Sequence, residues 1–529
     1  MKKFRSFFDL RQLHSFVIIG VIFSSWISAK PCSGKTLVIE EESNKLIICI
    51  SSLIISLDPT NYRDRNTQTV LKNMFDSLTT RDDNMKVVPQ LAESWEALDD
   101  TTWEFKLRRG VKFHNGDDFT AEDVRYTLKR VVKEGALDGK TSPRKGLLGP
   151  LASVRVVDDY TVQIQTEKPW AILPLMLTLQ EIVPKKYMEA VGPKGFQMNP
   201  IGTGPFRFVR AEGEEFLILE RFADYYGGSP GNPPVQVAPL KYLIFKTVSE
   251  RIERIAMLKK GECDIITDLP SEAVRILDMV PGIKVLSRPA TRSYFAEMNC
   301  AKSPFNDRRI RLAMNYAVDM HAVTDHILQG HGKVLPTVLL PNAFAYHASQ
   351  KPYPYNPKLA KKLLTDEGFS EGFSIVINYT EDNRQFASII AFFLTKVGVK
   401  SVINVVDRDR PGALGENAIW DILVTSWGNS TLDPVGILVP KFSTGGRGNY
   451  SNYSNEEVDR LLSQAEGTLD LRMRESYYKE VQEIIYSDVP MIFGYAAEER
   501  YGLREKVRSF IPSPSGMMSM HDVYIEDGG

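Results

Sequence analysis

The chain is poor in cysteine, carries almost no net charge and contains no long hydrophobic run. Its 4 cysteines in 529 residues exclude a disulfide-dense scaffold and leave room for one or two bridges. The 65 basic and 66 acidic residues give a formal net charge of −1, which does not favour a general electrostatic binder of nucleic acid. Glycine (36) and proline (30) are near average usage, which argues against collagen-like and low-complexity chains. The 43% of hydrophobic residues are enough for a large core, in roughly two to four domains.

Motifs of catalysis and of nucleotide binding are also missing. No GxSxG elbow and no HExxH pair occurs, so nothing obliges an enzyme. Residues 33–36 (SGKT) end like a phosphate-binding loop, but Ala29 stands where the first glycine is required. His321, His326 and His331 recur every five residues, which is a step of about 140° around a helix and cannot place all three on one face. We expect no metal site and no cofactor.

Residues 1–29 are predicted to be a signal peptide. Basic residues precede an apolar run at 16–27 (FVIIGVIFSSWI), and the small Ser28 and Ala29 follow it. A membrane anchor is the alternative, but 12 residues fall short of the roughly 20 that a bilayer core requires. Cys32 leaves a lipid anchor open, although Pro31 is a poor residue to precede a lipidated cysteine. The sequence therefore predicts an exported, periplasmic protein.

Hydrophobic periodicity along the rest of the chain predicts strands and helices in alternation, and hence a mixed α/β fold in two lobes. Residues 103–107 and 111–113 alternate about Arg109-Gly110, which predicts a hairpin. Strands are expected at 45–50, 154–157, 161–165, 206–209, 216–220, 373–379, 401–406 and 419–426. Helices are expected to begin at Thr120, Asp307 and Asn356, and to cover 387–396, 455–464 and 471–487.

Six segments, in order along the chain, resemble the motifs of one family. They are 89–96 (PQLAESWE), 103–116 (WEFKLRRGVKFHNG), 119–124 (FTAEDV), 199–206 (NPIGTGPF), 303–311 (SPFNDRRIR) with 317–319 (AVD), and 427–434 (WGNSTLDP). They are similar to motifs of the extracellular solute-binding proteins of family 5, which serve ABC importers of oligopeptides, dipeptides and related ligands. The resemblance extends from about residue 45 to 500.

This resemblance implies a two-lobed clamshell, a periplasmic binding protein of type II with an extra subdomain on lobe I. Lobe I would comprise residues 36–298, with the subdomain at about 80–199. Lobe II would comprise 299–489, and residues 490–529 would return to lobe I. Most of the matched residues are expected to serve folding, since glycines and prolines fix turns.

The resemblance also implies a ligand held between the lobes as an added extended strand. Many relatives place an aspartate three residues after the tryptophan of the W…DP segment, where it pairs with the ligand's ammonium. Counted from Trp427, that position holds Ser430. A buried ammonium without its carboxylate costs about 2–5 kcal/mol. Either another acid supplies the charge, or the ligand presents something other than an ordinary free N-terminus.

Further ligand-binding residues are expected from the same resemblance. Trp427 and Asn429 of the W…DP segment are expected to bind the ligand together with Ser430. Asp433 keeps the family's DP position, where either a turn role or a ligand role is open. Arg384 follows a strand from which some relatives reach the peptide carboxylate, although a solvated arginine is the alternative. Tyr294 completes the expected set.

A disulfide is implied in the same way. Cys49 on the first strand and Cys263 after a KxxEC-type turn occupy the places of a bonded pair in dipeptide-binding relatives. An exported compartment permits that bond. Cys300 is then expected to be a buried free thiol.

The function implied is that of a monomeric binding protein that delivers oligopeptides or peptide-like solutes to ABC permease subunits in the inner membrane, with no nucleic acid partner. The first alternative is a non-peptide solute, such as a metal chelate, haem or a sugar. The second alternative, from a different class, is an exported peptidase.

Overall fold

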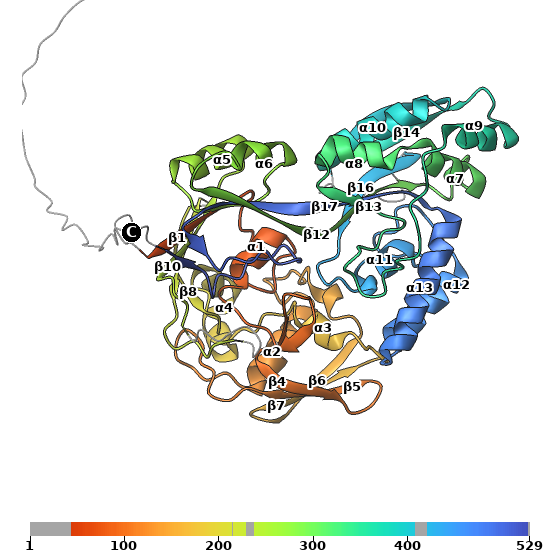
Figure 1. Ribbon diagram of the computed structural model, residues 1–529. Coiled ribbons are helices and arrows are strands. Elements are labelled where there is room, and N and C mark those ends of the chain that lie inside the picture. The colour runs from red at the N-terminus through yellow and green to blue at the C-terminus, as the bar shows by residue number, and fades with distance from the viewer. Residues whose placement is uncertain (1–43, 214, 229–236, 408–419, 527–529) are drawn as a thin grey trace, which may run out of the picture. The chain divides into compact units, whose positions relative to one another are not determined.

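The computed structural model describes residues 44–213, 215–228, 237–407 and 420–526 (Figure 1). The predicted signal peptide, Cys32 and the 33–36 segment lie outside these residues. Among the described helices, none is long and apolar enough to span a bilayer.

Among the described residues, 11 strands form one mixed sheet, in the order β15-β14-β16-β12-β17-β11-β1-β10-β9-β8, with β13 beside β17. These strands are β1 (Lys45–Ile50), β8 (Phe206–Glu212), β9 (Phe216–Arg221), β10 (Tyr242–Thr247), β11 (Ile265–Ile266), β12 (Ile283–Met298), β13 (Gly332–Val334), β14 (Phe373–Thr380), β15 (Val399–Val406), β16 (Ile422–Gly428) and β17 (Met491–Arg504). They confirm the strands predicted in these regions.

Two long strands, β12 and β17, link the two halves of this sheet. They pair antiparallel from Ile283↔Arg504 to Glu297↔Met491, and Figure 1 shows them side by side. Their register shifts between Pro289 and Ser293, where a proline without an N–H interrupts the ladder. Beyond this break β12 pairs with β16, whereas the far end of β17 pairs with β11. The lobe boundaries themselves stay a prediction.

A second sheet has the order β4-β5-β7-β6 and is covered by α2 (Ala121–Val132). Its strands are β4 (Ala92–Ala97), β5 (Thr102–Leu107), β6 (Leu151–Asp158) and β7 (Thr161–Thr166). The β6–β7 hairpin is confirmed, but the hairpin predicted for 103–113 is wrong: β5 pairs with β4 and β7. Phe113 N instead donates to Asp117 O at 2.9 Å and closes a local turn. The alternation of apolar and polar residues shows which face of a strand is buried, but it does not show which strand pairs with it.

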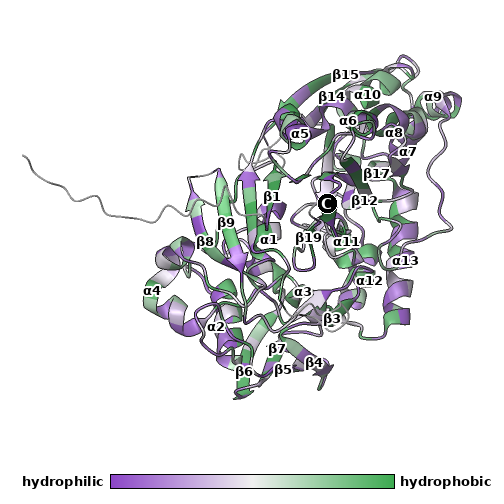
Figure 2. Ribbon diagram, turned by 60° about the vertical axis from the view of Figure 1, so that its left-hand side comes forward, coloured by the Kyte–Doolittle hydropathy of each residue, from purple (hydrophilic) through white to green (hydrophobic). Residues whose placement is uncertain are grey.

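Helices begin where the sequence offers caps. Asp307 accepts from Arg309 N, Asn356 accepts from Leu359 N, and Thr120 forms a capping box with Asp123. In Figure 2 polar and apolar residues alternate along α13, as expected for a helix with one buried face. The helices other than α2 are α1 (Arg65–Leu71), α3 (Leu173–Leu177), α4 (Lys185–Met198), α5 (Arg251–Lys260), α6 (Ser271–Leu277), α7 (Arg308–Ala317), α8 (Met320–Leu328), α9 (Pro357–Asp366), α10 (Arg384–Thr395), α11 (Leu438–Phe442), α12 (Glu456–Gly467) and α13 (Leu471–Asp488).

The turn at 199–206 shows why its glycines are needed. A Cβ at Gly202 would lie 2.1 Å from Met74 O, and Gly204 N donates to that same oxygen at 2.9 Å. His114 clasps the turn, because its Nδ1 accepts from Gly202 N at 3.2 Å and its Nε2 lies 3.0 Å from Gly204 O. Burial lowers the pKa of His114 to about 4, so the ring stays neutral as this arrangement requires. Two of the six matched motifs therefore meet here and serve folding.

Candidate functional site

One pocket lies between the segment 146–179, which carries α3, and the segment 428–447 that follows β16. We call it the Trp170 pocket; its volume is about 570 Å³. Its lining includes Arg63, Leu147, Lys168, Trp170, Ile172, Asn429, Ser430, Val435, Val439, Arg447 and Glu466. Its wall is apolar where Trp170, Ile172 and Val435 meet, and its remaining surface carries charge.

The charged residues of the Trp170 pocket are mostly basic. Of the residues that the structure describes, Arg63, Lys168 and Arg447 line it together with one acid, Glu466. Among the described residues, no carboxylate oxygen lies within the 4.0 Å ion-pair distance of any of these three cations. The Arg447 guanidinium lies over the Trp427 ring, 4.9 Å from its centroid. The pocket therefore presents more positive charge than the carboxylate of Glu466 can balance.

The W…DP segment forms one side of this pocket as a closed turn. Trp427 Nε1 donates to Gly436 O at 2.8 Å, which fixes the ring beneath Arg447. Asn429 is buried and its Nδ2 donates to Asp433 O at 2.9 Å. The Ser430 carbonyl accepts from the Arg81 guanidinium, whose pKa burial lowers to about 10. A cation of the protein thus approaches the position at which the family resemblance would lead one to expect an aspartate.

Asp433 faces away from the pocket. Its carboxylate is buried and pairs with Arg474 Nη2 at 2.6 Å, and it also accepts from Val435 N at 3.0 Å. With its oxygens occupied in this way, the contacts support the turn role and not the ligand role.

The second pocket, of about 470 Å³, surrounds the register break of β12 and β17, and we call it the Tyr294 pocket. Tyr294 lines it and stacks on Tyr495 with ring centroids 4.8 Å apart. Its charged lining residues are Asp64, Arg65, Arg251, Asp268, Arg292, Asp382, Glu498, Glu499 and Arg500. Basic and acidic side chains are nearly equal in number here, and Arg65 forms an ion pair with Glu499.

Thr291 of β12 stands between the two pockets. Its hydroxyl accepts from Arg65 Nη2 at 2.9 Å, and its carbonyl accepts from Asn429 N at 2.6 Å. Arg292, which lines the Tyr294 pocket, lies opposite Gly428, which lines the Trp170 pocket. The two pockets are therefore neighbouring compartments that share the β12–β16 pair as a border.

Arg384 lies apart from both pockets. It is the first residue of α10, its side chain is 57% exposed, and it makes two 2.8 Å bonds to Glu381. These contacts match the solvated alternative. The structure thus brings Asn429 and Ser430 to one pocket and Tyr294 to the other, and leaves Trp427, Arg384 and Asp433 out of both linings.

The basic residues of the Trp170 pocket were missed by the sequence reasoning. Arg63, Lys168 and Arg447 belong to no shared motif and come from three separate parts of the chain. The sequence held one hint of this basic lining, which is that position 430 is a serine and not the acidic residue expected from the family resemblance.

Cys49 and Cys263 are both buried, side by side and unbonded in the structure. A hydrogen bond from Cys263 is the main cause that lowers the pKa of the Cys49 thiol. The disulfide stays a prediction. Cys300 is an unbonded thiol as expected, but it is half-buried and not fully buried; loss of hydration raises its pKa to about 11.

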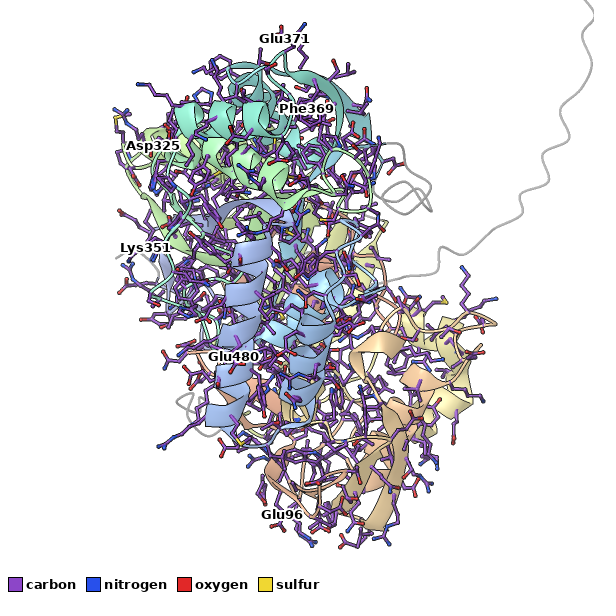
Figure 3. The ribbon with its side chains drawn as sticks, turned by 90° about the vertical axis from the view of Figure 1, so that its right-hand side faces the viewer. Glu96, Asp325, Lys351, Phe369, Glu371 and Glu480 are labelled. Carbon is purple, nitrogen blue, oxygen red and sulfur yellow. The ribbon has the colours of Figure 1, made fainter. Side chains whose placement is uncertain are left out.

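A shallow depression also runs along α13, where Figure 3 shows Glu480 on the surface. It is lined by Arg472, Glu475, Lys479 and Glu480, and Lys479 pairs with Glu475 at 2.6 Å. Exposed side chains that neutralise one another describe a solvated helix face.

A family model matches residues 86–449, and it describes the bacterial extracellular solute-binding proteins, family 5 Middle. The glutathione-binding protein GsiB of Pectobacterium atrosepticum is 28% identical over 498 residues, or 90% of this chain and 93% of that protein. GsiB of Escherichia coli (strain K12) is 28% identical over 466 residues, or 84% of this chain and 88% of that protein.

Two solved structures are similar over most of the chain. HbpA2 from Haemophilus parasuis has a TM-score of 0.81 and 26% identity, covering 91% of this chain and 100% of that one. The periplasmic binding protein DppA from Helicobacter pylori, in complex with the peptide STSA, has a TM-score of 0.78 and 25% identity, covering 91% and 98%. These likenesses confirm the predicted α/β, two-lobed fold of the type II periplasmic binding proteins.

Proposed function

The chain belongs to the bacterial extracellular solute-binding proteins of family 5, and we propose that it is the substrate-binding component of an ABC importer that captures peptides or peptide-like solutes. The observation that carries this proposal is the pair of neighbouring pockets joined at Thr291. Each is lined by residues from distant parts of the chain, as Arg63 and Arg447 show. The relatives' ligands, glutathione and the peptide STSA, belong to the same chemical class.

The pockets suit a short peptide in size and chemistry. The Trp170 pocket offers an apolar wall for a side chain, and the Tyr294 pocket offers both signs of charge for the ends and amides of a peptide. In this proposal the protein is exported to the periplasm, acts as a monomer, passes its ligand to permease subunits and performs no chemistry on it.

The alternatives have less support. Among the described residues, no group of three or more His, Cys, Asp or Glu side chains lies together as a metal site would need.

The test is calorimetric titration of the mature protein with glutathione, a dipeptide, a tetrapeptide and a sugar. We expect binding of at least one peptide with a stoichiometry of one, and recovery of that peptide intact by mass spectrometry. Ser430→Trp should fill the Trp170 pocket and weaken binding, whereas Ser153→Trp on the exposed face of β6 should not. Binding of the sugar alone, or cleavage of a peptide, would refute the proposal.

A further inference from the structure

Three cations from separate segments converge on the Trp170 pocket. Arg63 precedes α1, Lys168 follows β7, and Arg447 follows α11. The single acid of the lining, Glu466, lies beyond the ion-pair distance of Lys168, although the Lys168 charge still acts on it. The positive charge of this pocket is therefore larger than its one carboxylate can balance.

The fold brings Arg63 and Arg447 together against their mutual repulsion. Partial loss of hydration, and then the charges of Arg447 and Arg144, lower the pKa of Arg63. The Arg63 guanidinium donates a hydrogen bond to an uncharged acceptor, Pro143 O, at 3.2 Å. Arg447 rests on the Trp427 ring. Both side chains keep solvent-exposed surface, so an incoming ligand can reach them.

The surroundings of these arginines define the shape of a ligand. Trp170 and Ile172 are buried in the wall and present apolar surface to the pocket. Ser430 contributes no charge, and its carbonyl is already bonded to a further cation, Arg81. An ammonium group would meet like charges here, whereas a carboxylate would meet donors with no acid to displace.

We propose that the Trp170 pocket is an acidic-group subsite, in which a carboxylate of the peptide ligand binds between Arg63 and Arg447 and the adjoining carbons pack on Trp170. The ligand class is accordingly that of short acidic peptides. This assignment rests on the proposed function, because it names the kind of peptide that the protein captures. An ordinary peptide ammonium binds outside this pocket.

The experiment uses two matched ligand pairs and calorimetry on the mature protein. The pairs are glutathione with its glycine ethyl ester, and Ala-Glu-Ala with Ala-Gln-Ala. In at least one pair the wild type should bind the acid about ten- to a hundred-fold more tightly than its neutral partner. Arg63→Gln with Arg447→Gln should reduce this ratio to about threefold or less. The control Arg155→Gln, on an exposed strand where it bonds Gln163, should leave the ratio unchanged.

The outcomes separate the two proposals. Binding of both members of each pair with equal affinity would overturn the acidic-group subsite and leave the proposed function standing. Absence of binding by all four peptides would overturn the proposed function itself. Inorganic phosphate, titrated alone, is the further probe: binding of phosphate without an acid preference among the peptides would show a bare anion site and contradict the assignment.

Discussion

The Trp170 pocket and the Tyr294 pocket lie on either side of Thr291, yet their charges are arranged differently. In the Tyr294 pocket Arg65 pairs with Glu499, and Asp268 accepts from Ser51 Oγ at 2.5 Å. In the Trp170 pocket the basic side chains have no such partners among the described residues. A charged side chain that has an ion-pair partner within the chain contributes to the fold, whereas one without such a partner is available to bind a ligand.

The same contrast recurs within the Trp170 region. Behind its open face, Lys441 is fully buried and donates to Glu297 and to Gly448 O. The Lys441 ammonium lies 5.3 Å from the Trp427 ring centroid, on whose surface Arg447 also rests. The buried Lys441–Glu297 ion pair therefore lies beneath the Trp427 ring, and Arg447, which has no carboxylate partner among the described residues, lies above it. Substitutions of the buried pair should change stability, whereas substitution of Arg447 should mainly change ligand binding.

The largest effect is expected from two cysteines, Cys49 and Cys263, whose chain segments lead into the Tyr294 pocket. β1 carries Cys49 and leads directly to Ser51, and Cys263 precedes β11, which leads to Asp268. A bond would close a loop of more than 200 residues, for which the entropic model gives about 5 kcal/mol, an upper value because native strain usually reduces it. Cys49→Ser with Cys263→Ser should lower the unfolding free energy in urea, whereas Cys300→Ser should change it little.

Non-reducing peptide mapping provides the direct check on that bond. We expect Cys49 and Cys263 in one linked fragment of the exported protein. Recovery of both as free thiols would contradict the predicted bond.

A second, smaller loss is expected when the buried Lys441–Glu297 ion pair is broken. Glu297→Gln leaves Lys441 buried without its carboxylate, which should cost about 4 kcal/mol of unfolding free energy. Glu457→Gln, at an exposed ion pair on α12, is the matched control and should cost less than about 1 kcal/mol. If Glu297→Leu combined with Lys441→Met restores the unfolding free energy of the wild type, the ion pair contributes more to the choice of one folded structure than to its stability. A Glu297→Gln loss no larger than the control would contradict the expected effect of the buried pair on stability.

The parts of the fold that could be predicted are those with local causes. Capping residues such as Asp307 placed helix starts, and the turn at 199–206 was recognisable from its cluster of glycines and prolines. The structure gives the reason for one of these glycines, because a Cβ at position 202 would collide with Met74 O. The partner of β5 was not predictable, since alternation at 103–107 shows which face is buried but not which strand lies alongside.

The site was predicted in part, for a comparable reason. Asn429 and Ser430 could be placed because they share a segment with Trp427. Asp433 and Arg384 have side chains suited to a ligand, but the structure gives them internal partners, Arg474 and Glu381 respectively. Such pairing depends on tertiary contacts, and a sequence that lists charges does not show which ones the fold will neutralise.

A third test compares one charged residue from each pocket. Glu499→Gln removes the partner of Arg65, and the pair is 31% and 21% exposed, so solvent screening limits the expected loss to about 1–2 kcal/mol. Arg447→Gln removes a cation that no carboxylate of the described residues pairs with, so only its contact with the Trp427 ring is lost and the unfolding free energy should fall by less than about 1 kcal/mol. Urea unfolding of both variants gives the comparison. Equal losses of unfolding free energy would show that Arg447 also stabilises the fold. They would contradict the distinction between charges that have an ion-pair partner in the chain and charges that do not.

The smallest effect is expected from Ser430→Asp, which tests the Trp170 pocket at its border. If the pocket followed the arrangement that the family resemblance implies, an aspartate here would attract the ligand's ammonium, and this variant would strengthen binding of free-amine peptides. In this chain the new carboxylate would instead lie beside the open cations of the pocket, and Arg447 or Arg63 would pair with it. We therefore expect the preference for Ala-Glu-Ala over Ala-Gln-Ala to fall by about 1 kcal/mol, or roughly fivefold.

Ser430→Asn is the matched control for that variant, because it has the size of aspartate without the charge and should preserve the preference for the acid. N-acetylated forms of both peptides complete the calorimetric series. If Ser430→Asp leaves the acid preference intact and strengthens only the free-amine forms, the ammonium binds at position 430 after all. The basic side chains would then belong to the rim of the site, and the difference between the two pockets would be one of solvation and not of ligand chemistry.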